Sequence, residues 1–481
     1  MTDRIPVHDA LCRRPGRNPR RPVMRPEPKP GSSAGEVSLP RLVAWKVLRS
    51  VAAGAFADVA LEREFRRHGS RLGAADRALT MELTYGSIRQ RRLLDHWLDY
   101  CGALPAQQQP PTLRWLLHLG LYQLLFAHRI PEAVAVSSSV DLAKAYGLGR
   151  LASVVNGLLR TVVRCRQRQE KPPLPPQATT RLAVQHSLPD WLADLLLHWL
   201  PEGEAVAFAG LTNQPPHLDL RVNRLRASVA EVQAAWAAVD QPLLPIAMAP
   251  QGLQLSRGVG AMARQPGYST GQWSVQDRAA QLVTPLLQPQ PGHVVVDLCA
   301  APGGKTTHMA ELMEDQGRIV AVDRSAARLR RLQRNARRLG LRSIQTRCAD
   351  ARTLPHLHGC ADRVLLDAPC SGLGTLARHA CARWRLSPVD IAEMQVLQRQ
   401  LLNEALRLVR PGGRLVYSTC TVHPAENQAQ IESLLNRHPH WRPCLLPEAL
   451  RRLCGHSTQL RLWPQRHGCD GFFAVALEPV T

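Results

Sequence analysis

Apolar residues recur every three or four positions along the first third of the chain, which is the period of an α-helix. The clearest stretches are Val43, Ala44, Val47, Leu48 and Val51, and later Leu113, Leu116, Leu117, Leu121 and Leu124. No alternating stretch typical of a strand interrupts this pattern, and Gly and Pro residues divide it into roughly five to seven segments. The pattern therefore predicts an all-α domain over residues 38–170.

The pattern changes after this domain. A proline-rich run, residues 171–180, predicts a semi-rigid linker. Residues 181–265 begin with a helical apolar period, alternate like a strand at 218–225 and return to a helical period at 229–238. They predict a helical connector followed by a small α/β subdomain.

From residue 266 to residue 481, segments with a strand pattern and segments with a helical pattern follow one another in turn. Such an order is typical of a doubly wound parallel sheet, so we predict an α/β Rossmann-like domain. Ser387 and Asp390 are placed to cap a long helix, and residues 414–419 are predicted to form the strand after it. Open sheets of this kind bind ligands at the carboxyl ends of their strands, so the residues found there are the first candidates for a site.

Residues 294–307 predict a strand, a loop rich in Gly and Pro, and a helix, the unit that opens many nucleotide-binding sheets. A Walker phosphate loop would need Gly where Cys299 stands, which excludes a loop of that type. A second strand ends at Asp323, twenty residues after Gly303, where doubly wound folds place the acid that binds a ribose. The spacing indicates an adenosine-type ligand, with an acid that merely caps the next helix as the alternative.

The chain of 481 residues carries 61 Lys and Arg against 38 Asp and Glu, a formal net charge of +23. Such a surplus favours a polyanionic partner, nucleic acid in the first place, although high arginine usage throughout a proteome also produces it. Residues 1–37 are rich in Pro and Arg, cannot form a core and are predicted to be a disordered basic tail. No apolar run approaches the roughly 18 residues of a membrane helix, and nothing near the N-terminus resembles a signal peptide. We therefore predict a cytoplasmic protein without a membrane partner.

Twelve cysteines are spread along the chain without a C-x-x-C pair, so we predict no metal site. Cys370 follows one predicted strand together with Asp367, and Cys420 follows another. Two thiols and a carboxylate beside a cofactor suit the alkylation of a pyrimidine carbon. A thiolate that adds to C6 of cytosine makes C5 nucleophilic enough to take a methyl group, and a base must then remove the C5 proton. For each cysteine taken alone, a buried small hydrophobe is the alternative.

Five motifs in a fixed order carry a closer resemblance. They are Val275-Gln-Asp277, Asp297-Leu-Cys-Ala-Ala-Pro-Gly-Gly-Lys-Thr306, Asp367-Ala-Pro-Cys-Ser-Gly372, Tyr417-Ser-Thr-Cys420 with Pro424-Ala-Glu-Asn427, and Asp470-Gly-Phe-Phe473. This series resembles that of the NOL1/NOP2/Sun family of RNA cytosine-5 methyltransferases and covers about residues 265–481. In the helical region, Asp76-Arg-Ala-Leu-Thr-Met-Glu-Leu-Thr-Tyr-Gly86 resembles the NusB family of RNA-binding domains.

The resemblance implies a multidomain protein. A NusB-like all-α domain, residues 38–170, would precede an S-adenosylmethionine-dependent methyltransferase domain of Rossmann-like fold, residues 266–481. Between them, residues 181–265 would contain a small α/β RNA-binding insert, in which Arg221, Asn223 and Arg224 point toward the nucleic acid. A solvated strand face is the alternative for these three. The predicted helix within 324–342 holds eight arginines and no acid, so it is either a phosphate-facing stripe or a solvated face.

The resemblance also implies a role for each motif residue. Cys420 would be the nucleophile, Cys370 would assist product release, and Asp367 would lie between the methyl donor and the target base. S-adenosylmethionine would be the cofactor, bound by Cys299, Ala300, Ala301, Pro302, Gly303, Gly304, Lys305, Asp323, Asp350 and Asp367. Among these, Asp323 would hold the ribose and Asp350 would lie by the adenine.

The implied reaction is methylation of C5 of a specific cytosine in 16S, small-subunit, ribosomal RNA through a covalent bond between Cys420 and C6. The expected partner is this RNA in an unassembled or partly assembled subunit, and the expected protein is a monomer. Two alternatives stay open. One is an RNA-binding ribosome assembly factor that retains the fold, and the other is a cytosine-5 methyltransferase that acts on another RNA or on DNA. In the DNA enzyme, Cys370 would be the attacking thiol. Ala380 and Cys381 replace a Pro-Asp pair of the family pattern, and the effect on that loop stays open as well.

Overall fold

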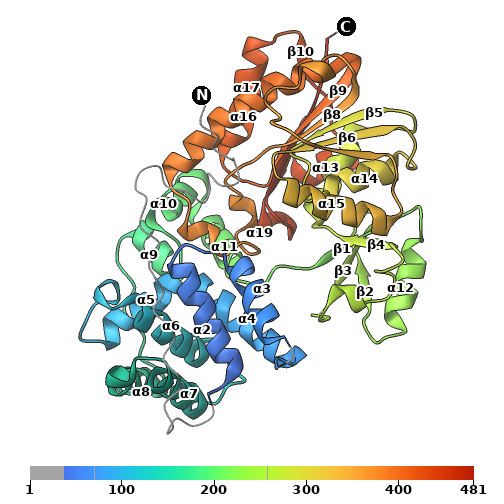
Figure 1. Cartoon of the computed structure of the whole chain (residues 1–481). Coiled ribbons are helices and arrows are strands. Elements are labelled where there is room, and N and C mark those ends of the chain that lie inside the picture. The colour runs from blue at the N-terminus through green and yellow to red at the C-terminus, as the bar shows by residue number, and fades with distance from the viewer. Residues whose placement is uncertain (1–36, 70, 257, 481) are drawn as a thin grey trace, which may run out of the picture. The chain divides into compact units, whose positions relative to one another are not determined.

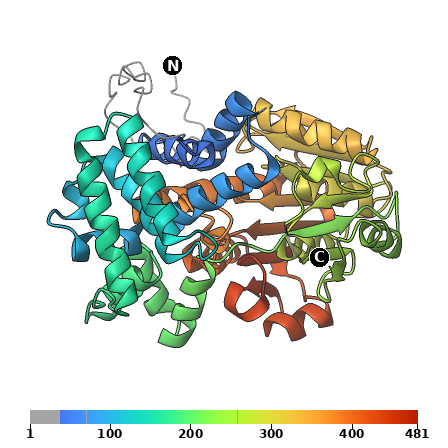
Figure 2. The same cartoon turned by 90° about the horizontal axis from the view of Figure 1, so that it is seen from below.

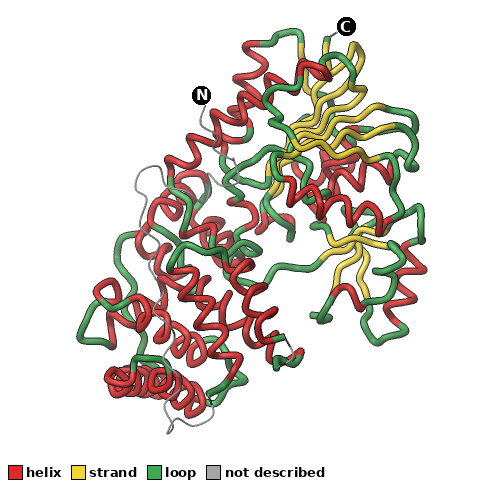
Figure 3. The backbone as a smooth tube through the Cα atoms, viewed as in Figure 1, coloured by secondary structure: helices red, strands yellow, loops and turns green. Residues whose placement is uncertain are grey.

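The computed structural model describes residues 37–69, 71–256 and 258–480. Apart from its last position, the predicted basic tail lies outside these residues. The described chain forms two compact units: a helical unit of residues 37–214 with 379–385, and a mixed unit of residues 215–378 with 386–480. Figure 3 shows that the strands belong to the mixed unit. Where one functional domain ends and the next begins stays a prediction.

The helical unit is drawn in blue to green in Figure 1. Its described α-helices are α2 Leu39–Ala52, α3 Ala57–His68, α4 Ala74–Arg89, α5 Arg91–Cys101, α6 Pro111–Leu125, α7 Glu132–Ala145, α8 Ala152–Gln167, α9 Ala178–Gln185, α10 Asp190–Trp199 and α11 Glu202–Leu211. Pro111 is the first residue of α6, where its fixed φ and missing N–H are compatible with the helix. The prediction of an all-α region is confirmed.

The apolar positions with helical spacing form the core of this unit. The buried residues include the predicted ones: Val43, Ala44, Val47, Leu48, Leu113, Leu116, Leu117, Leu121 and Leu124. Burial of one such large aliphatic side chain stabilises a fold by roughly 1.5–3 kcal/mol. Helix α6, which carries the last five of these residues, packs against α2, α4, α7 and α8.

A segment from later in the chain, residues 379–385, is part of the helical unit. Ala380 is 1% exposed and belongs to the core of the unit, and Cys381 packs against that core. Arg383 is fully buried, and Nη2 of its guanidinium donates a hydrogen bond to the carbonyl oxygen of Thr212 at 2.7 Å. The two residues that depart from the family pattern are thus packing residues of the helical unit.

The mixed unit is built on a sheet with the spatial order β10-β12-β9-β8-β5-β6-β7, and β11 pairs with β12. The strands are β5 Val294–Leu298, β6 Arg318–Asp323, β7 Ile344–Cys348, β8 Ala361–Asp367, β9 Val409–Thr419, β10 Trp441–Pro443, β11 Gln459–Leu462 and β12 Phe472–Pro479. Strands β5 to β9 are parallel, and β10 to β12 pair antiparallel. The chain leaves β5 toward β7 and returns at β8 on the other side of β5. The junction between β5 and β8 is therefore the point at which such sheets bind ligands.

Helices cover both faces of this sheet (Figure 1). They are α13 Arg278–Leu287, α14 Gly304–Leu312, α15 Ala326–Leu339, α16 Pro388–Leu408, α17 Gln428–Arg437, α18 Glu448–Cys454 and α19 Pro464–His467. Successive strand residues point to opposite faces: Val295 joins the core beneath α13, α14 and α15, whereas Val296 joins the core beneath α16 and α17. The predicted Rossmann-like α/β fold is confirmed, but the sheet is mixed rather than wholly parallel, because β10, β11 and β12 pair antiparallel. None of the described helices is long and apolar enough to cross a membrane.

A second, smaller sheet lies in the same unit and has the antiparallel order β2-β3-β1-β4. Its elements are β1 Asp219–Val222, α12 Val229–Ala237, β2 Leu243–Pro245, β3 Gly252–Leu255 and β4 Trp273–Val275. Trp236 of α12 and Trp273 of β4 are fully buried, and their ring centroids are 5.4 Å apart. Strands β1, β2 and β3 and helix α12 lie within the predicted subdomain of residues 181–265, whereas β4 comes from the range predicted for the methyltransferase domain.

Candidate active site

Most of the residues predicted to act lie at the carboxyl ends of four neighbouring strands. Strand β5 leads into the predicted cofactor loop, β6 ends at Asp323, β8 ends at Asp367 shortly before Cys370, and β9 is followed by Cys420. These strands are adjacent in the order β9-β8-β5-β6. Neighbouring strands lie about 4.8 Å apart, so the topology gathers the four groups at one edge of the sheet.

The predicted cofactor loop, residues 299–305, turns sharply between β5 and α14. Cys299 has a φ of 64° and Gly303 a φ of 105°. A Cβ on Gly303 would lie 2.5 Å from Cγ of Leu332, so neither the backbone conformation nor the space admits a larger residue. Gly303 therefore allows the start of α14 to pack closely against α15.

Asp323 is buried at the end of β6. Its carboxylate accepts hydrogen bonds from the backbone N–H groups of Ala301 (3.2 Å) and Ser325 (2.8 Å), and it pairs with Arg328 at 3.1 Å. These contacts match the alternative interpretation, an acid that orders the start of the next helix. They also leave part of the carboxylate's roughly four acceptor positions for a ligand such as a ribose.

Asp350 follows the neighbouring strand β7. Arg352 lies 2.7 Å from its carboxylate, and Arg324 lies 4.0 Å away. Burial favours the neutral form of Asp350, but the hydrogen bonds from Arg352 outweigh this effect and lower the pKa below its usual value. Asp350 is therefore an ionised acceptor at neutral pH, as contact with the amino group of an adenine requires.

The buried acid Asp297 provides a test of whether this end of the sheet fits S-adenosylmethionine. Thr306 donates to Oδ2 of Asp297 at 2.6 Å, whereas Oδ1 is buried and has no hydrogen-bond partner among the described residues. Burial raises the pKa of Asp297 to about 7. An unsatisfied buried acceptor is costly, and a ligand with donor groups would satisfy it. Together with Asp323 and Asp350, it gives acceptors that suit the hydroxyl and amino groups of this cofactor.

Asp367 is held from two sides. Nζ of Lys305 lies 2.8 Å from its Oδ2, and the hydroxyl of Ser418 donates to its Oδ1 at 2.8 Å. Nζ of Lys305 also lies 4.7 Å from the centroid of the Phe472 ring. Lys305 thus connects the cofactor loop to the end of β8, and Ser418, which sequence analysis did not single out, connects that acid to β9. The side chain of Asp367 remains 33% exposed, so it can contact a substrate.

The side chains of the two predicted cysteines are in contact. Sγ of Cys370 and Sγ of Cys420 are 3.5 Å apart. Cys370 is buried and Cys420 is half-buried, so the second sulfur is the more accessible one. The hydrogen bond with Cys420 and burial raise the pKa of the Cys370 thiol well above its usual range. Cys370 is therefore a neutral thiol at neutral pH.

Glu426 holds the loops of the two cysteines together, and sequence analysis did not predict this role. It is buried, and its Oε1 accepts hydrogen bonds from the backbone N–H of Ser371 (2.9 Å) and from the side-chain amide of Gln398 (3.0 Å). The hydroxyl of Ser371 donates to the other carboxylate oxygen and lies 2.8 Å from the hydroxyl of Thr421. Since Thr421 directly follows Cys420, this carboxylate sets the position of one loop against the other.

Arg378 joins two further motif segments to the loop that follows Cys370. Its guanidinium pairs with Asp277 at 2.7 Å and with Asp470 at 2.7 Å. Burial raises the pKa of Asp470 to about 7. The motifs that contain these two acids, which sequence analysis used only as family markers, are therefore structural partners of the loop.

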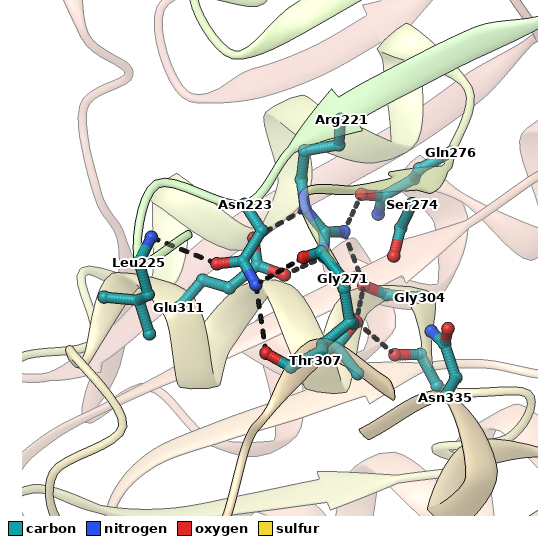
Figure 4. Close-up of polar contacts among 12 residues, drawn as sticks. Arg221, Asn223, Leu225, Gly271, Ser274, Gln276, Gly304, Thr307, Glu311 and Asn335 are labelled. Carbon is teal, nitrogen blue, oxygen red and sulfur yellow. Dashed lines mark hydrogen bonds and ion pairs between the residues drawn. The ribbon is translucent and has the colours of Figure 1, made fainter. Parts of the chain in front are cut away.

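The prediction that Arg221 points toward a nucleic acid is wrong. Arg221 is fully buried, and its guanidinium pairs with Glu311 at 2.7 Å (Figure 4). It also donates to the carbonyl oxygen of Gly304 at 2.8 Å and to the hydroxyl of Thr307 at 3.1 Å. The polar side of strand β1 faces helix α14 rather than solvent. The alternating sequence pattern alone predicts that Arg221 lies in water, but the ion pair with Glu311 compensates its charge in the interior. Arg221 thus supports the start of α14, which is also the end of the cofactor loop.

The same prediction is wrong for Asn223. Asn223 is buried, and its amide donates to the carbonyl oxygens of Gly271 (3.0 Å) and Leu339 (3.2 Å) (Figure 4). Gly271 has a φ of 72°, and a Cβ there would lie 2.2 Å from the carbonyl oxygen of Arg338. Asn223 therefore fixes the small sheet to the end of α15. Arg224, by contrast, is exposed, and its contact with RNA stays a prediction.

Three family models match the chain. Residues 284–478 match the family described as 16S rRNA methyltransferase RsmB/F. Residues 38–164 match the NusB family, and residues 188–261 match a ferredoxin-like domain described as RsmF/B-like. The NusB-like and methyltransferase parts predicted from the sequence are confirmed.

Similar proteins cover most of the chain. A probable ribosomal RNA small subunit methyltransferase B of Synechocystis sp. is 42% identical over 446 residues, which are 91% of this chain and 99% of that protein. A protein of the same description from Bacillus subtilis is 33% identical over 425 residues, 84% of this chain and 91% of its own. The crystal structure of PH0851 superposes with a TM-score of 0.77 at 30% identity and covers 91% of this chain and 98% of its own. The chain therefore belongs to the ribosomal RNA small subunit methyltransferase B family and is an S-adenosylmethionine-dependent methyltransferase.

Proposed function

We propose that the protein methylates C5 of a specific cytosine in small-subunit ribosomal RNA through a transient bond between Sγ of Cys420 and C6 of the base. The single observation that carries this proposal is the approach of two thiols to 3.5 Å at the cofactor edge of the sheet. The relatives described as small subunit methyltransferases support this RNA as substrate, and the net charge of +23 suits a polyanion. We further propose that the enzyme acts in the cytoplasm as a monomer on unassembled or partly assembled subunits.

In this mechanism Cys420 acts as the nucleophile. S-adenosylmethionine, when bound, supplies the methyl group, and the electrons of the broken bond between sulfur and methyl carbon stay on the sulfur. The thiolate of Cys420 forms a bond to C6, and the electron pair of the C5–C6 double bond becomes available at C5, which takes the methyl group. The Cys370 thiol gives up its own proton to water, and the resulting thiolate takes the C5 proton. The electrons of the C5–H bond then restore the double bond and expel the Cys420 thiolate.

The paired side chains of Asp367 and Lys305 have a supporting role in this proposal. Attack at C6 moves negative charge onto the ring, toward N3 and its neighbours. Asp367 would accept a hydrogen bond from the exocyclic amine, while Lys305, at 2.8 Å from the carboxylate, holds it in place and supplies a positive charge that offsets the negative charge on the ring. Fixed charges of this kind act strongly where water is excluded.

The raised pKa of Cys370 suits a base that acts only after the nucleophile has reacted. The largest cause of the shift is the hydrogen bond with Cys420, followed by burial. Once Cys420 is bonded to carbon, it is a thioether without a charge or a thiol hydrogen, so this cause disappears. Cys370 then becomes a stronger acid, and its thiolate is available for the C5 proton.

Incubation of unmodified small-subunit ribosomal RNA with methyl-labelled S-adenosylmethionine tests the proposal. We expect 5-methylcytidine at one position, detected by nucleoside mass spectrometry after digestion. Cys420→Ala should abolish turnover while calorimetry shows unchanged cofactor binding, and Cys370→Ala should accumulate a protein–RNA adduct. Cys360→Ala, which changes an exposed cysteine outside the site, is the matched control.

Each other outcome has a definite meaning. Full turnover by Cys420→Ala would exclude it as the nucleophile. Label in DNA but not in RNA, with an adduct on Cys370, would favour the DNA-methylating alternative. Cofactor binding without transfer to any nucleic acid would favour an assembly factor that retains the fold.

A further inference from the structure

Helix α15 carries a row of arginines that have no acidic partner. Arg330, Arg334 and Arg337 are exposed and are spaced four and three residues apart, so they lie on one side of the helix. None of the three forms an ion pair with a described residue. The side of the helix that packs on the sheet buries Leu329, Leu332, Ala336 and Leu339. In Figure 2 this helix, drawn in gold, lies on the outside of the strands.

Two other arginines of α15 make contacts that stabilise the structure. Arg328 pairs with Asp323 at 3.1 Å. Arg338 donates to the carbonyl oxygen of Tyr268 at 2.7 Å, and its guanidinium lies 4.2 Å from the centroid of that ring. The exposed arginines have no such contact, and like charges three or four residues apart on a helix repel one another. Ion pairs within the described part of the chain therefore do not account for them.

Arg226, which follows strand β1 of the small sheet, has a structural contact at the end of this helix. Its Nε lies 3.4 Å from the carbonyl oxygen of Leu339, and a Cβ on Gly340 would lie 1.6 Å from its Nη2. Asn223 donates to the same carbonyl oxygen of Leu339 at 3.2 Å. Arg226 therefore packs against the end of α15 and is not counted among the arginines without a partner.

We propose that Arg330, Arg334 and Arg337, here called the arginine row, bind phosphate groups of the ribosomal RNA that flanks the target nucleotide. The proposal rests on the proposed function, since it takes RNA as the substrate. The guanidinium is suited to phosphate because it is always charged and presents several donors in one plane.

The dimensions of the site agree with a flanking segment. At 1.5 Å per residue, the row from Arg330 to Arg337 spans about 10 Å. This length is enough to contact two or three phosphates. Helix α15 begins at Ala326, three residues after Asp323 at the end of β6, and three strand spacings, about 14 Å, separate β6 from β9 and Cys420. The arginines lie about 6 to 16 Å further along the helix, which runs back from this edge. Several nucleotides of single-stranded RNA bridge that distance.

The salt dependence of RNA binding tests the proposal. The full chain with Arg330→Gln, Arg334→Gln and Arg337→Gln is titrated against fluorescently labelled, unmodified small-subunit ribosomal RNA at several KCl concentrations. Each phosphate contact to single-stranded RNA contributes about 0.7 to the slope of log affinity against log salt, so three contacts lower the slope by about 2. Affinity at 0.1 M salt should fall by about tenfold to hundredfold on the same basis.

The matched control removes the same charge elsewhere in the unit: Arg318→Gln, Arg399→Gln and Arg451→Gln, all of which change exposed arginines. We expect the control to keep the wild-type slope, cofactor affinity and methylation rate, and the α15 variant to keep the wild-type cofactor affinity. An unchanged slope in the α15 variant, or an equal loss in the control, would overturn the arginine row while leaving the proposed function intact. Failure of the wild type to methylate RNA would instead overturn the proposed function.

Discussion

Replacement of Arg221 by Met tests the corrected role of this residue. The change removes the guanidinium but keeps an unbranched apolar side chain. In the wild type this group pairs with Glu311 and donates to the carbonyl oxygen of Gly304, the first residue of α14. Arg221→Met should therefore lower both the stability of the mixed unit and its affinity for the cofactor.

The loss of stability in Arg221→Met can be estimated from the burial of the ion pair. The side chains of Arg221 and Glu311 are 0% and 2% exposed. Removal of one partner of a buried ion pair costs about 3–5 kcal/mol, because the remaining charge stays buried without compensation. For a unit of roughly this size, each kcal/mol lowers the melting temperature by about 2–4 °C, so we expect a decrease of about 6–20 °C.

The effect should depend on pH. Burial raises the pKa of Glu311, and Arg221 is the main influence that opposes this rise. Without Arg221 the folded-state pKa rises further above its unfolded value, so folding at acidic pH is coupled to protonation of Glu311. The protonated carboxyl is neutral and tolerates burial. The destabilisation should thus be smaller at pH 5 than at pH 8.

Thermal and urea unfolding, followed by circular dichroism at both pH values, measure these effects, and calorimetry measures cofactor affinity. The control is the double variant Arg221→Met with Glu311→Leu, which removes both charges and should recover most of the lost stability. A single variant as stable as the wild type, or a double variant no more stable than the single one, would refute the reasoning.

Three further changes have expected outcomes. Glu426→Ala leaves the N–H and the hydroxyl of Ser371 without their acceptor, so we expect about 2–5 kcal/mol lower stability and slower methyl transfer at unchanged RNA affinity in single-turnover assays; a wild-type rate would contradict this. Asp297, with a pKa of about 7 against 3.8 for the ordinary group, holds a proton in the folded state that the unfolded state releases between these pH values. The free energy of unfolding of the wild type should therefore fall as the pH rises across this range. Its decrease should exceed that of Asp297→Asn by about 1.4 kcal/mol per pH unit, as urea unfolding at several pH values would show. Equal pH dependence in the two proteins would contradict this. Lys305→Met removes the cation beside Asp367, so kcat should fall by about tenfold to hundredfold with little change in melting temperature, as steady-state kinetics would show.

The features that the sequence predicted well have local signals. The cap of α16 is an example: the backbone N–H of Ser387 donates to the carboxylate of Asp390 at 2.8 Å, and the spacing of these two residues alone predicts it. The strand, loop and helix at residues 294–307 are likewise encoded by β-branched residues, Gly and Pro within a few positions. Parallel topology then brings the ends of β8 and β9 together, so the approach of the thiols follows from the fold class.

The features that the sequence did not predict depend on partners far along the chain. Alternation marked Arg221 as a residue on the polar side of a strand, but Glu311, 90 positions away, makes that side an interior. The motif around Glu426 was recognised, but nothing near it indicates Ser371, 55 positions earlier. The burial of Ala380 in the helical unit depends on the cores of α-helices encoded some 300 residues before it. In each case the tertiary partner decides whether a polar or small residue lies in water or in a core.

The most direct test of the central claim is to trap the bond between protein and base. Small-subunit ribosomal RNA transcribed with 5-fluorocytidine is incubated with the full chain and S-adenosylmethionine, because fluorine at C5 cannot leave as a proton and the adduct persists. After digestion with protease and nuclease, mass spectrometry should find a methylated fluoropyrimidine attached to the peptide that contains Cys420. Attachment to Cys370, or no attachment although RNA and cofactor are bound, would contradict the account.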